Sequence, residues 1–361
     1  MVQYPLSELQ PGMIVASDVF TPQGQLIVSC GTYLSQQMIQ HMRYYHIKTV
    51  TILPNEVTPV SKDARPHEEP SYARRIRQSQ EFTAFREQYT QSAGIFQAQL
   101  QDFVRGNSPL DTQALLEDTI TLFRHNQATF SLLDMLHNMR DLDDSTYVHS
   151  INVSVIARLI GVWSELKEED LDTLTLCGLL HDIGKVKIPQ EIIGKPDRLT
   201  AEEYAIMKQH TVFGYELLAH EDIDVRIKNA ALMHHERYDG TGYPFGLVGE
   251  RIDTFASIIA IADVYDALTA DRCYRAGVCP FEVIAIFESN GLHEYNPHFI
   301  LTFLEHIAGT YTGYGVRLSD GSTGKLVMIN QHRLTRPLIQ LDNGDFVDLT
   351  KRLDLYVEEL I

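Results

Sequence analysis

Histidine and aspartate recur in the middle of this chain, beside strongly apolar helical runs. Each such imidazole or carboxylate would be costly to bury without a partner. A single histidine of this kind is most simply explained as a hydrogen-bonded core residue, but a repeated set on successive helices favours a metal centre. In chain order the set is His149, His181, Asp182, His210, His234, His235 and Asp263.

The ligand types in this set narrow the metal and its chemistry. Imidazole and carboxylate ligands without thiolates suit divalent transition metals such as iron, manganese or zinc. The four cysteines form no Cys-x-x-Cys pair, so the ligands must be nitrogen and oxygen atoms. A carboxylate can bridge two ions through its two oxygens. Two ions about 3.5–4 Å apart are the usual clamp for in-line displacement at phosphorus, and they lower the pKa of bound water toward neutrality.

The stretch HHERYDGTGYP at 234–244 places two imidazoles side by side. Adjacent residues on a helix point about 100° apart, so His234 and His235 could not easily face one partner inside a helix. At a helix end that unwinds into a glycine-rich turn, both rings can point to the same place. We therefore expect a helix to end at this pair.

A second pair, His181-Asp182, follows the apolar run LTLCGLL and precedes Gly184. We expect Gly184 to end this helix and to leave His181 and Asp182 at its exposed C-terminal tip.

Helices are expected to position most of these residues, because residues 110–310 show helical periodicity almost throughout. The runs LLEDTITLFRHNQATFSLLDML and HSINVSVIARLIGVW are amphipathic. The run LTAEEYAIMKQHTVFGYELL opens with Thr200 and Glu203 in capping-box spacing. The run FASIIAIADVYDALTA is apolar nearly all round, which predicts a central buried helix.

The N-terminal part of the chain reads as a small mixed module. GMIVASDVF and GQLIVSCGTYL predict a hairpin around TPQG, and SQQMIQHMRYYHI predicts a helix before the strand KTVTIL. Residues 55–71 are rich in proline and charge and predict a linker. The polar stretch 72–106 predicts a connecting helix that could pack on a partner.

The last fifty or so residues change character again. Asp-Gly and Asn-Gly turns between short apolar runs predict β-hairpins. The fold class is therefore mostly α, a helical bundle with a small N-terminal α/β module and a small C-terminal β appendage. The expected domains are the N-terminal module at 1–54, the linker and connecting helix at 55–106, the helical domain at 107–310 and the β-hairpin module at 311–361.

Net charge and hydropathy restrict the partners. A formal charge of −18 argues against nucleic-acid polymers and anionic membranes, and an anionic small ligand would need local lysines and arginines. The N-terminal residues lack the pattern of a signal peptide, and the longest apolar patch, VSVIARLIGVW, is too short to span a bilayer. With cysteines that read as reduced thiols, we expect a soluble cytoplasmic protein.

The ordered set of histidines and aspartates resembles the metal-dependent HD phosphohydrolase superfamily. HDIGKVKIP, HHERYDGTGYP and IADVYDALTADRCYR are similar to its HD-GYP branch, the bacterial cyclic-di-GMP phosphodiesterases. The resemblance covers roughly residues 140–300, and the start of the chain resembles a small domain often found ahead of HD-GYP units. It implies an HD-type helical bundle that opens cyclic di-GMP to linear pGpG, with GMP as a further product, through attack of metal-bound hydroxide on phosphorus.

The resemblance also implies the metal ligands. Asp182 would bridge two divalent ions, iron or manganese in the first place, with zinc, nickel and magnesium as alternatives. The ligands of one ion would be His149, His181 and Asp263, and those of the other would be His210, His234 and His235.

Residues for the substrate follow from the same resemblance. Lys185, Arg272 and Arg275 match the phosphate-binding cations of the family, and Tyr243 would contact a phosphate or a base. Asp182 and Lys185 would be the catalytic residues. In a chain of net charge −18, cations beside a metal site are better explained by a phosphate ligand than by solvated surface charge.

Alternative interpretations remain at this point. The same chemistry could act on 3',3'-cyclic GMP-AMP, and a non-catalytic sensor could bind the dinucleotide and signal through the flanking modules. Other HD enzymes hydrolyse nucleotides or alarmones but generally lack the GYP loop. A homodimer or a signalling-protein partner would use the N-terminal module or the connecting helix.

Ser145 generates the first testable prediction. Some family members have a glutamate here, four residues before the first histidine, that helps to bind a third ion. Serine is a poor ligand, although Asp144 lies beside it. We expect two ions and accumulation of the linear dinucleotide, because a third ion could anchor the new terminal phosphate for a second cleavage. A chromatographic time course under excess metal, with metal content measured on the same sample, checks this. Rapid, complete conversion to mononucleotide, or about three ions per chain, would contradict it.

Overall fold

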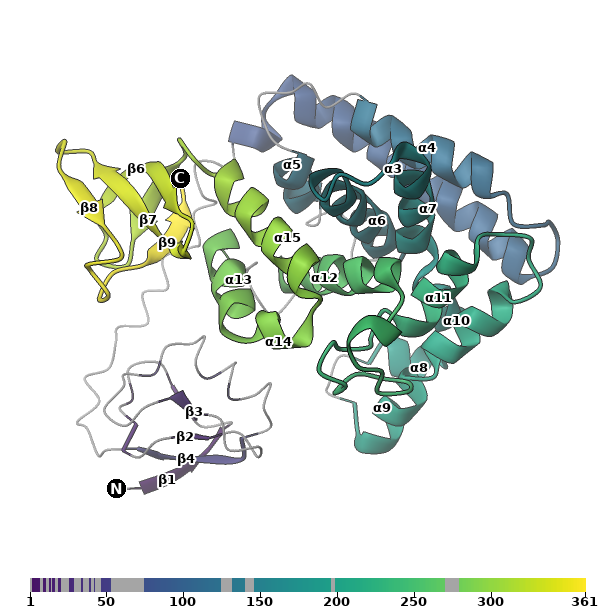
Figure 1. Cartoon of the computed structure of the whole chain (residues 1–361), viewed down its shortest axis with the longest axis horizontal. Helices are drawn as coiled ribbons and strands as arrows, with labels where there is room; N and C mark the ends of the chain where they lie inside the picture. The colour runs from purple at the N-terminus through teal and green to yellow at the C-terminus, as the bar shows by residue number, and fades with distance from the viewer. Residues whose placement is uncertain are drawn as a thin grey trace. The chain divides into compact units, whose positions relative to one another are not determined.

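The protein is described here from a computed structural model of the whole chain (Figure 1). The described residues are 2–6, 9–10, 13, 15–16, 19–20, 26–28, 34, 39, 42, 47–52, 75–124, 132–139, 146–195, 199–269 and 279–361. The chain divides into two compact units, Met1–Glu68 and Glu69–Ile361.

The N-terminal unit contains two small antiparallel strand pairs. Strand β1 (Val2–Pro5) pairs with β4 (Thr49–Ile52), and β2 (Val19–Phe20) pairs with β3 (Leu26–Val28). These pairs confirm the strands expected in GMIVASDVF, GQLIVSCGTYL and KTVTIL, whereas β1 was not expected. The TPQG turn and most of the helix expected at SQQMIQHMRYYHI lie outside the described residues. The unit has its own core, made by Leu6, Leu9, Val15, Val19, Leu34, Ile39, Met42, Val50 and Ile52.

The second unit is mostly helical, as the periodicity predicts. Its first half contains α3 (Gln80–Val104), α4 (Thr112–Arg124), α5 (Leu132–Met139), α6 (Thr146–Trp163), α7 (Glu168–Leu180), the short 3-10 helix η2 (Ile183–Lys187) and α8 (Gln190–Ile193). Its second half contains α9 (Ala201–Met207), α10 (His210–Leu218), α11 (Val225–Met233), η3 (Gly249–Arg251), α12 (Thr254–Thr269), α13 (Pro280–Ile286), the π-helical turn η4 (Phe287–Gly291), α14 (Leu292–Glu294) and α15 (Pro297–Thr310).

Helix α12 lies at the centre of this bundle, against α6, α7 and α11 (Figure 1). Its sequence is apolar on nearly every side, and residues from Phe255 through Asp263 are all buried. A helix without a polar face is stable in water only when other helices surround it. The expectation of a central buried helix is confirmed, and α12 carries Asp263 into the interior.

Helix α3 packs within the same unit. Its apolar stripe, which includes Phe85 and Phe96, is buried against neighbouring helices. The hydroxyl of Tyr89 lies 2.6 Å from Asn152 Oδ1 and 3.0 Å from the Val148 carbonyl oxygen, both on α6. The helix expected to connect domains therefore uses its apolar stripe inside its own unit, where it supports α6.

The run expected as one helix from Thr200 is two helices in the structure. Thr200 caps α9, and the reciprocal bond from Glu203 completes the expected capping box. The helix ends at Met207, and α10 begins at His210. The break places His210 in the first turn of α10.

A five-stranded antiparallel sheet ends the chain. Its strand order is β8-β7-β6-β5-β9, formed by β5 (Gly315–Leu318), β6 (Thr323–Asn330), β7 (Arg333–Leu341), β8 (Phe346–Asp348) and β9 (Val357–Leu360). Figure 1 shows it in yellow beside α13 and α15, on which β7 packs. Glu288 of η4 accepts hydrogen bonds from the Leu334 amide at 2.7 Å and the Thr335 hydroxyl at 2.7 Å. The expected β appendage is present, and it shares the helical core.

No helix within the described ranges combines the length and apolarity needed to cross a membrane.

Gly178 generates a prediction about the packing that supports the centre. A Cβ atom at Gly178 of α7 would lie 2.4 Å from Ser154 Cα on α6, too close for the two backbones to remain in place. Gly178→Ala should lower the free energy of unfolding, toward the upper end of the about 1–3 kcal/mol typical of overpacking. Urea denaturation followed by circular dichroism measures the change.

The matched control is Gly309→Ala, because a Cβ there meets nothing within 4 Å and the residue lies in α15. That variant should be as stable as the parent or more stable by about 0.5–1 kcal/mol. Equal midpoints for Gly178→Ala and the parent would contradict the close-packing interpretation.

Candidate metal centre

His181 and Asp182 lie at the end of α7, as expected, but they are buried. Helix α7 ends at Leu180, and His181 and Asp182 are 0% and 3% exposed. The expected exposed tip is therefore wrong. The reason lies at Gly184, where a Cβ atom would lie 1.9 Å from the His210 carbonyl oxygen. Gly184 lets η2 pack directly on the start of α10, and this packing covers the end of α7.

The adjacent histidines lie at the end of α11, as expected. The helix ends at Met233, and His234 is its C-cap. The ring centroids of His234 and His235 are 4.2 Å apart, and both rings lie near His210. The chain then turns, which lets both side chains face the same region.

The two oxygens of Asp182 face different groups of histidines. Oδ1 lies 3.3 Å from His210 Nε2 and 3.7 Å from His234 Nε2. Oδ2 lies 3.3 Å from His181 Nε2 and 3.6 Å from His149 Nε2. One carboxylate therefore joins two sets of nitrogen atoms.

These contacts form two groups that could each hold a metal ion. Within each group, one ligand atom from every residue lies within 4.8 Å of the others. One group is His149, His181 and Asp182, and the other is Asp182, His210, His234 and His235.

Asp263 lies beside both groups. Its Oδ1 is 3.1 Å from His149 Nε2, and its Oδ2 is 3.8 Å from His235 Nδ1. The structure thus brings every histidine and aspartate of the sequence-derived set to one place in the helical unit.

Hydrogen bonds fix the orientation of three of the buried rings. The Nδ1 atoms of His181, His210 and His234 lie 2.7, 2.7 and 2.9 Å from carbonyl oxygens three or four residues earlier. Because a carbonyl only accepts, each Nδ1 must carry the proton, which leaves the lone pair on Nε2. The three lone pairs then point toward Asp182.

This arrangement fits a cation. His210 Nε2 and His234 Nε2 are 3.3 Å apart, and neither carries a proton to share. In the described part of the chain, the buried atoms His181 Nε2 and Asp182 Oδ1 have no hydrogen-bond partner. Buried acceptors without a partner cost about 1–3 kcal/mol each. A divalent ion would satisfy them, because imidazole nitrogen and carboxylate oxygen are its ordinary ligands.

The histidine pKa values favour neutral rings, as metal ligation requires. Burial lowers the pKa of His149 and His210, and lowers that of His234 far below its usual value. Burial also lowers the pKa of His235 to about 3. His181 differs, because Asp182 raises its pKa in spite of burial.

The carboxylates stay ionised. Burial alone would raise the pKa of Asp182, but Lys185 and His181 hold it well below its usual value. His149 and His235 do the same for the pKa of Asp263. Lys185 forms an ion pair with Asp182 Oδ2, and its side chain is 26% exposed. The cation expected to bind phosphate therefore lies at the centre.

Asp266 is a residue of the site that the sequence analysis did not single out. Its Oδ2 lies 2.8 Å from His149 Nδ1, so it orients the ring and directs Nε2 toward Asp263 and Asp182. A carboxylate behind a histidine ligand is a common way to fix the ring and increase its basicity. The available signal was its place three residues after Asp263 on one helix, because such positions share a face.

Tyr243 lies against the ligand set, as a substrate wall would. Its ring stacks on His235 with centroids 4.7 Å apart and planes 28° apart, and its amide donates to the His235 carbonyl oxygen at 3.1 Å. Gly242 permits this turn, because a Cβ there would lie 2.3 Å from the Arg237 amide nitrogen. The glycines of the loop therefore allow the backbone to fold back on the end of α11.

Glu236 is a second residue that sequence reasoning missed. It is 2% exposed, and its carboxylate accepts hydrogen bonds from the amides of Phe245 at 2.7 Å and Leu247 at 2.9 Å. Because Glu236 follows His235 directly, it ties residues 245–247 to the end of α11. A buried charge needs specific partners, and here they are two amides across a loop, so the sequence carried no local signal beyond the position of Glu236 directly after the histidine pair.

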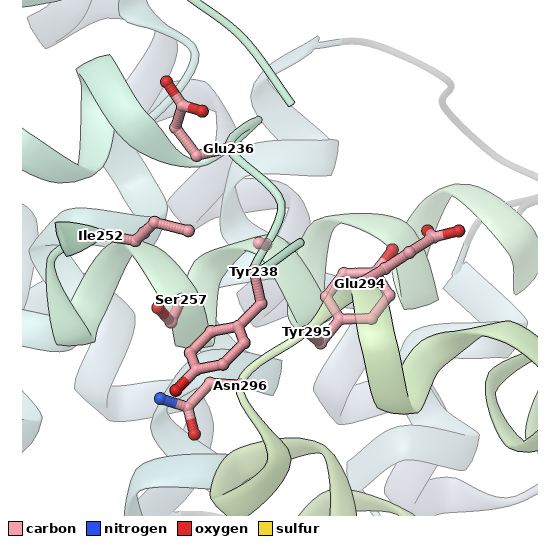
Figure 2. Close-up of a pocket in the computed structure, with 8 residues that line it drawn as sticks. Glu236, Tyr238, Ile252, Ser257, Glu294, Tyr295 and Asn296 are labelled. Atoms are coloured by element: carbon pink, nitrogen blue, oxygen red, sulfur yellow. The ribbon is translucent and has the colours of Figure 1, made fainter. Parts of the chain in front are cut away.

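Glu236 also borders a small pocket, shown in Figure 2. The pocket contains none of the candidate metal ligands. It lies between the loop after α11 and the α14–α15 junction, and its lining residues are Glu236, Tyr238, Ile252, Ser257, Ala260, Glu294, Tyr295 and Asn296. Asn296 caps α15, with Pro297 in the first turn of the helix.

Some residues named from the sequence lie outside the described residues. These are Arg272 and Arg275, expected to bind phosphate, and Asp144 and Ser145, expected to decide the number of ions.

The profile of the HD domain family matches residues 114–299, which include every candidate ligand. The chain belongs to the HD domain family. This confirms the superfamily resemblance, and it agrees with the geometry, because an HD domain binds divalent metal and the His/Asp groups of this chain could hold such ions.

Similar proteins carry more specific names. This HD protein is 35% identical over 218 residues to the cyclic di-GMP phosphodiesterase PA4108 of Pseudomonas aeruginosa, covering 60% of this chain and 51% of that protein. It is 39% identical over 165 residues to the cyclic di-GMP phosphodiesterase response regulator RpfG of Xanthomonas campestris, covering 45% and 43%. The chain spans about half the length of these curated relatives.

Other similarities are weaker or point to a second substrate. The 3'3'-cGAMP-specific phosphodiesterase 2 of Vibrio cholerae is 34% identical over 163 residues, covering 45% of this chain and 31% of that protein. Among solved structures, Bd1817, an HD-type protein of Bdellovibrio bacteriovorus, aligns with a TM-score of 0.47 at 16% identity, covering 85% of this chain and 99% of that chain.

Glu236→Ala leaves the amides of Phe245 and Leu247 without their acceptor, so the loop should loosen. We expect a loss of about 1.5–3 kcal/mol in unfolding free energy, the range for hydrogen bonds to charged groups, and faster cleavage between residues 237 and 248. Urea denaturation and limited proteolysis measure the two effects.

Glu250→Ala is the matched control, because Glu250 is exposed and, among the described residues, its carboxylate accepts a hydrogen bond from the Tyr238 hydroxyl of the same loop alone, at 2.7 Å. It should change stability by less than about 0.5 kcal/mol. If the two variants behave alike, Glu236 does not hold the loop.

Proposed function

We propose that this HD domain is a metal-dependent phosphodiesterase that hydrolyses cyclic di-GMP to linear pGpG. The observation that carries the proposal is the position of Asp182, whose two oxygens face separate groups of histidine nitrogens. A bridging carboxylate of this kind suits a two-ion centre, which serves in-line displacement at phosphorus. The names of PA4108 and RpfG support the same substrate.

The residues present would hold two divalent ions. His149, His181 and Asp263 would bind one, His210, His234 and His235 would bind the other, and Asp182 would bridge them. Iron or manganese suits this nitrogen- and oxygen-rich set best, with zinc, nickel and magnesium as alternatives. When bound, the ions would lower the pKa of a water molecule and neutralise charge on the scissile phosphate.

Protein groups supply the rest of the proposed chemistry. Asp266 keeps the His149 ring in place through Nδ1. Lys185 lies at Asp182 with its side chain 26% exposed, so it can reach a phosphate oxygen bound at the centre. Tyr243, held against His235, would form a wall of the substrate site. We propose Arg272 and Arg275 as further phosphate-binding cations.

A second substrate is favoured by a specific observation. Two relatives from Vibrio cholerae, at 34% and 36% identity, are named 3'3'-cGAMP-specific phosphodiesterases. The catalytic groups would be the same, and only contacts with the bases would differ. A non-catalytic dinucleotide sensor ranks lower, because the candidate ligands are all kept and brought together.

The remaining parts of the chain receive related proposals. We propose 107–310 as the catalytic domain, 1–54 as a regulatory module joined through 55–106, and 311–361 as a supporting sheet. A homodimer or a signalling partner would contact the N-terminal module or the exposed side of α3. We propose a cytoplasmic location, which the free cysteines Cys177 and Cys279 and an intracellular second messenger as substrate would support.

Asp182 generates the decisive test. Asp182→Ala should abolish hydrolysis of cyclic di-GMP in manganese or ferrous iron and lower bound metal, because both groups of histidines lose their shared ligand. Helicity should stay near the parent value. Turnover by chromatography, metal content by mass spectrometry and circular dichroism on one preparation give the three readouts.

Asp222→Ala is the matched control. Asp222 is exposed in the turn between α10 and α11. The length of α10, about 13 Å, separates this turn from the centre. It should hydrolyse cyclic di-GMP at the parent rate. Turnover by Asp182→Ala close to that of the parent would refute the proposed site.

A further inference from the structure

A cluster of two aromatic rings and one cation lies next to the candidate centre, and of its three residues the proposed chemistry uses only Tyr243. Tyr204 of α9 and Tyr243 of the loop have ring centroids 6.5 Å apart in an edge-to-face arrangement. The ammonium of Lys208 lies 5.3 Å from the centre of the Tyr204 ring and 5.8 Å from that of Tyr243. Because Tyr243 also stacks on His235, the cluster adjoins a candidate metal ligand.

Tyr204 is unusually exposed for an aromatic residue in this position. Its exposed fraction is 49%, although its ring contacts Tyr243, which stacks on the candidate ligand His235. Among the described residues, the Tyr204 ring makes an edge-to-face contact with Tyr243 and a contact with the Lys208 ammonium, so part of the ring surface remains open to solvent. An open aromatic face stacks well on a nucleobase, a contact worth about 1–3 kcal/mol per base.

Lys208 differs from two other lysines of the helical unit, which are paired with carboxylates. Lys185 is paired with Asp182, and Lys195 is paired with Glu203. Lys208 forms no ion pair with a carboxylate in the described part of the chain, and it is held instead by two aromatic faces. Its charge therefore remains available to an anion.

The proposed substrate has features that match this cluster. A cyclic dinucleotide carries two phosphodiesters, and only the scissile one can lie over the metal pair. The second phosphate stays anionic, which is unfavourable beside a chain of net charge −18 unless a cation lies near it. The two purine bases are broad and flat. When one phosphate is bound at the metal pair, at least one base must extend away from the metals, in the direction of the sugar to which it is attached.

We propose that Tyr204 and Lys208 form a second-nucleotide subsite, in which the Tyr204 ring stacks on a purine base and the Lys208 ammonium binds the non-scissile phosphate. Tyr243 contacts both Tyr204 and His235, so it lies between this subsite and the candidate ligands. The inference rests on the proposed function and identifies residues that distinguish a dinucleotide from a simple phosphodiester.

The test compares two substrates in the manganese-loaded, full-length protein. Cyclic di-GMP has bases and two phosphates, whereas methyl p-nitrophenyl phosphate is a diester with one phosphate and no nucleobase. Tyr204→Ala and Lys208→Ala should each raise KM for cyclic di-GMP about tenfold, with kcat and metal content nearly unchanged. Each variant removes a contact that stabilises the bound substrate and the transition state equally. Both variants should hydrolyse methyl p-nitrophenyl phosphate as the parent does.

Conservative variants separate the two contacts. Tyr204→Phe keeps the ring and should keep KM within about twofold, since stacking needs no hydroxyl. Lys208→Arg keeps the charge and should restore most of the affinity that Lys208→Ala loses. The Lys208→Ala defect should shrink as salt is raised, whereas the Tyr204→Ala defect should persist, because salt screens charge.

Matched controls lie on other helices of the same unit. Tyr215→Ala removes a half-exposed tyrosine from α10, five residues after His210 and so about 140° around the helix from it. Lys167→Ala removes an exposed lysine at the start of α7, the end opposite His181. Both should leave KM unchanged.

The outcomes separate the two proposals. A parent protein that hydrolyses the simple diester but neither cyclic di-GMP nor cyclic GMP-AMP overturns the proposed function. An active parent with KM for cyclic di-GMP unchanged in Tyr204→Ala and Lys208→Ala overturns the subsite alone. Equal losses on both substrates also overturn the subsite, because they would mean that the variants damage the centre.

Discussion

A buried carboxylate enclosed by imidazole nitrogens is the constraint on which the helical unit depends. Asp182 is 3% exposed and ionised, and a buried charge is tolerated only where positive groups or metal compensate it. Helices α7 and α11 end at this point and α10 begins there, so three helix termini converge on one side chain. The two C-terminal ends carry partial negative charge, which adds to the preference for a cation.

This convergence requires close contact between backbones, and the packing of the unit follows from it. Gly178 lets α7 approach α6, and Gly184 lets η2 lie against the start of α10. The central helix α12 then brings Asp263 and Asp266 to opposite sides of the His149 ring. The geometry of the centre is thus set by helix packing, while its chemistry is set by the orientation of the rings.

Much of this could be predicted from the sequence, because metal ligands and helix ends leave local signals. The apolar run of α12, the end of α11 at His234 and the capping box at Thr200 all follow from residue order and spacing. Burial of Asp182 could not be predicted, since it depends on α10, which is distant in sequence. Asp266 and Glu236 were missed for a related reason, because their partners are a ring on another helix and two amides across a loop.

The clamp that Glu288 makes on β7 has a consequence for how this protein unfolds. Its carboxylate holds the Leu334 amide and the Thr335 hydroxyl, and Val316, Leu326 and the helices share one hydrophobic core. Elements that share a core and a buried polar contact tend to open together in a single cooperative unit. Amide hydrogen exchange in the terminal sheet should therefore report on the same global opening as exchange in the helices around the centre. The sheet and the helical bundle would then unfold as one cooperative unit.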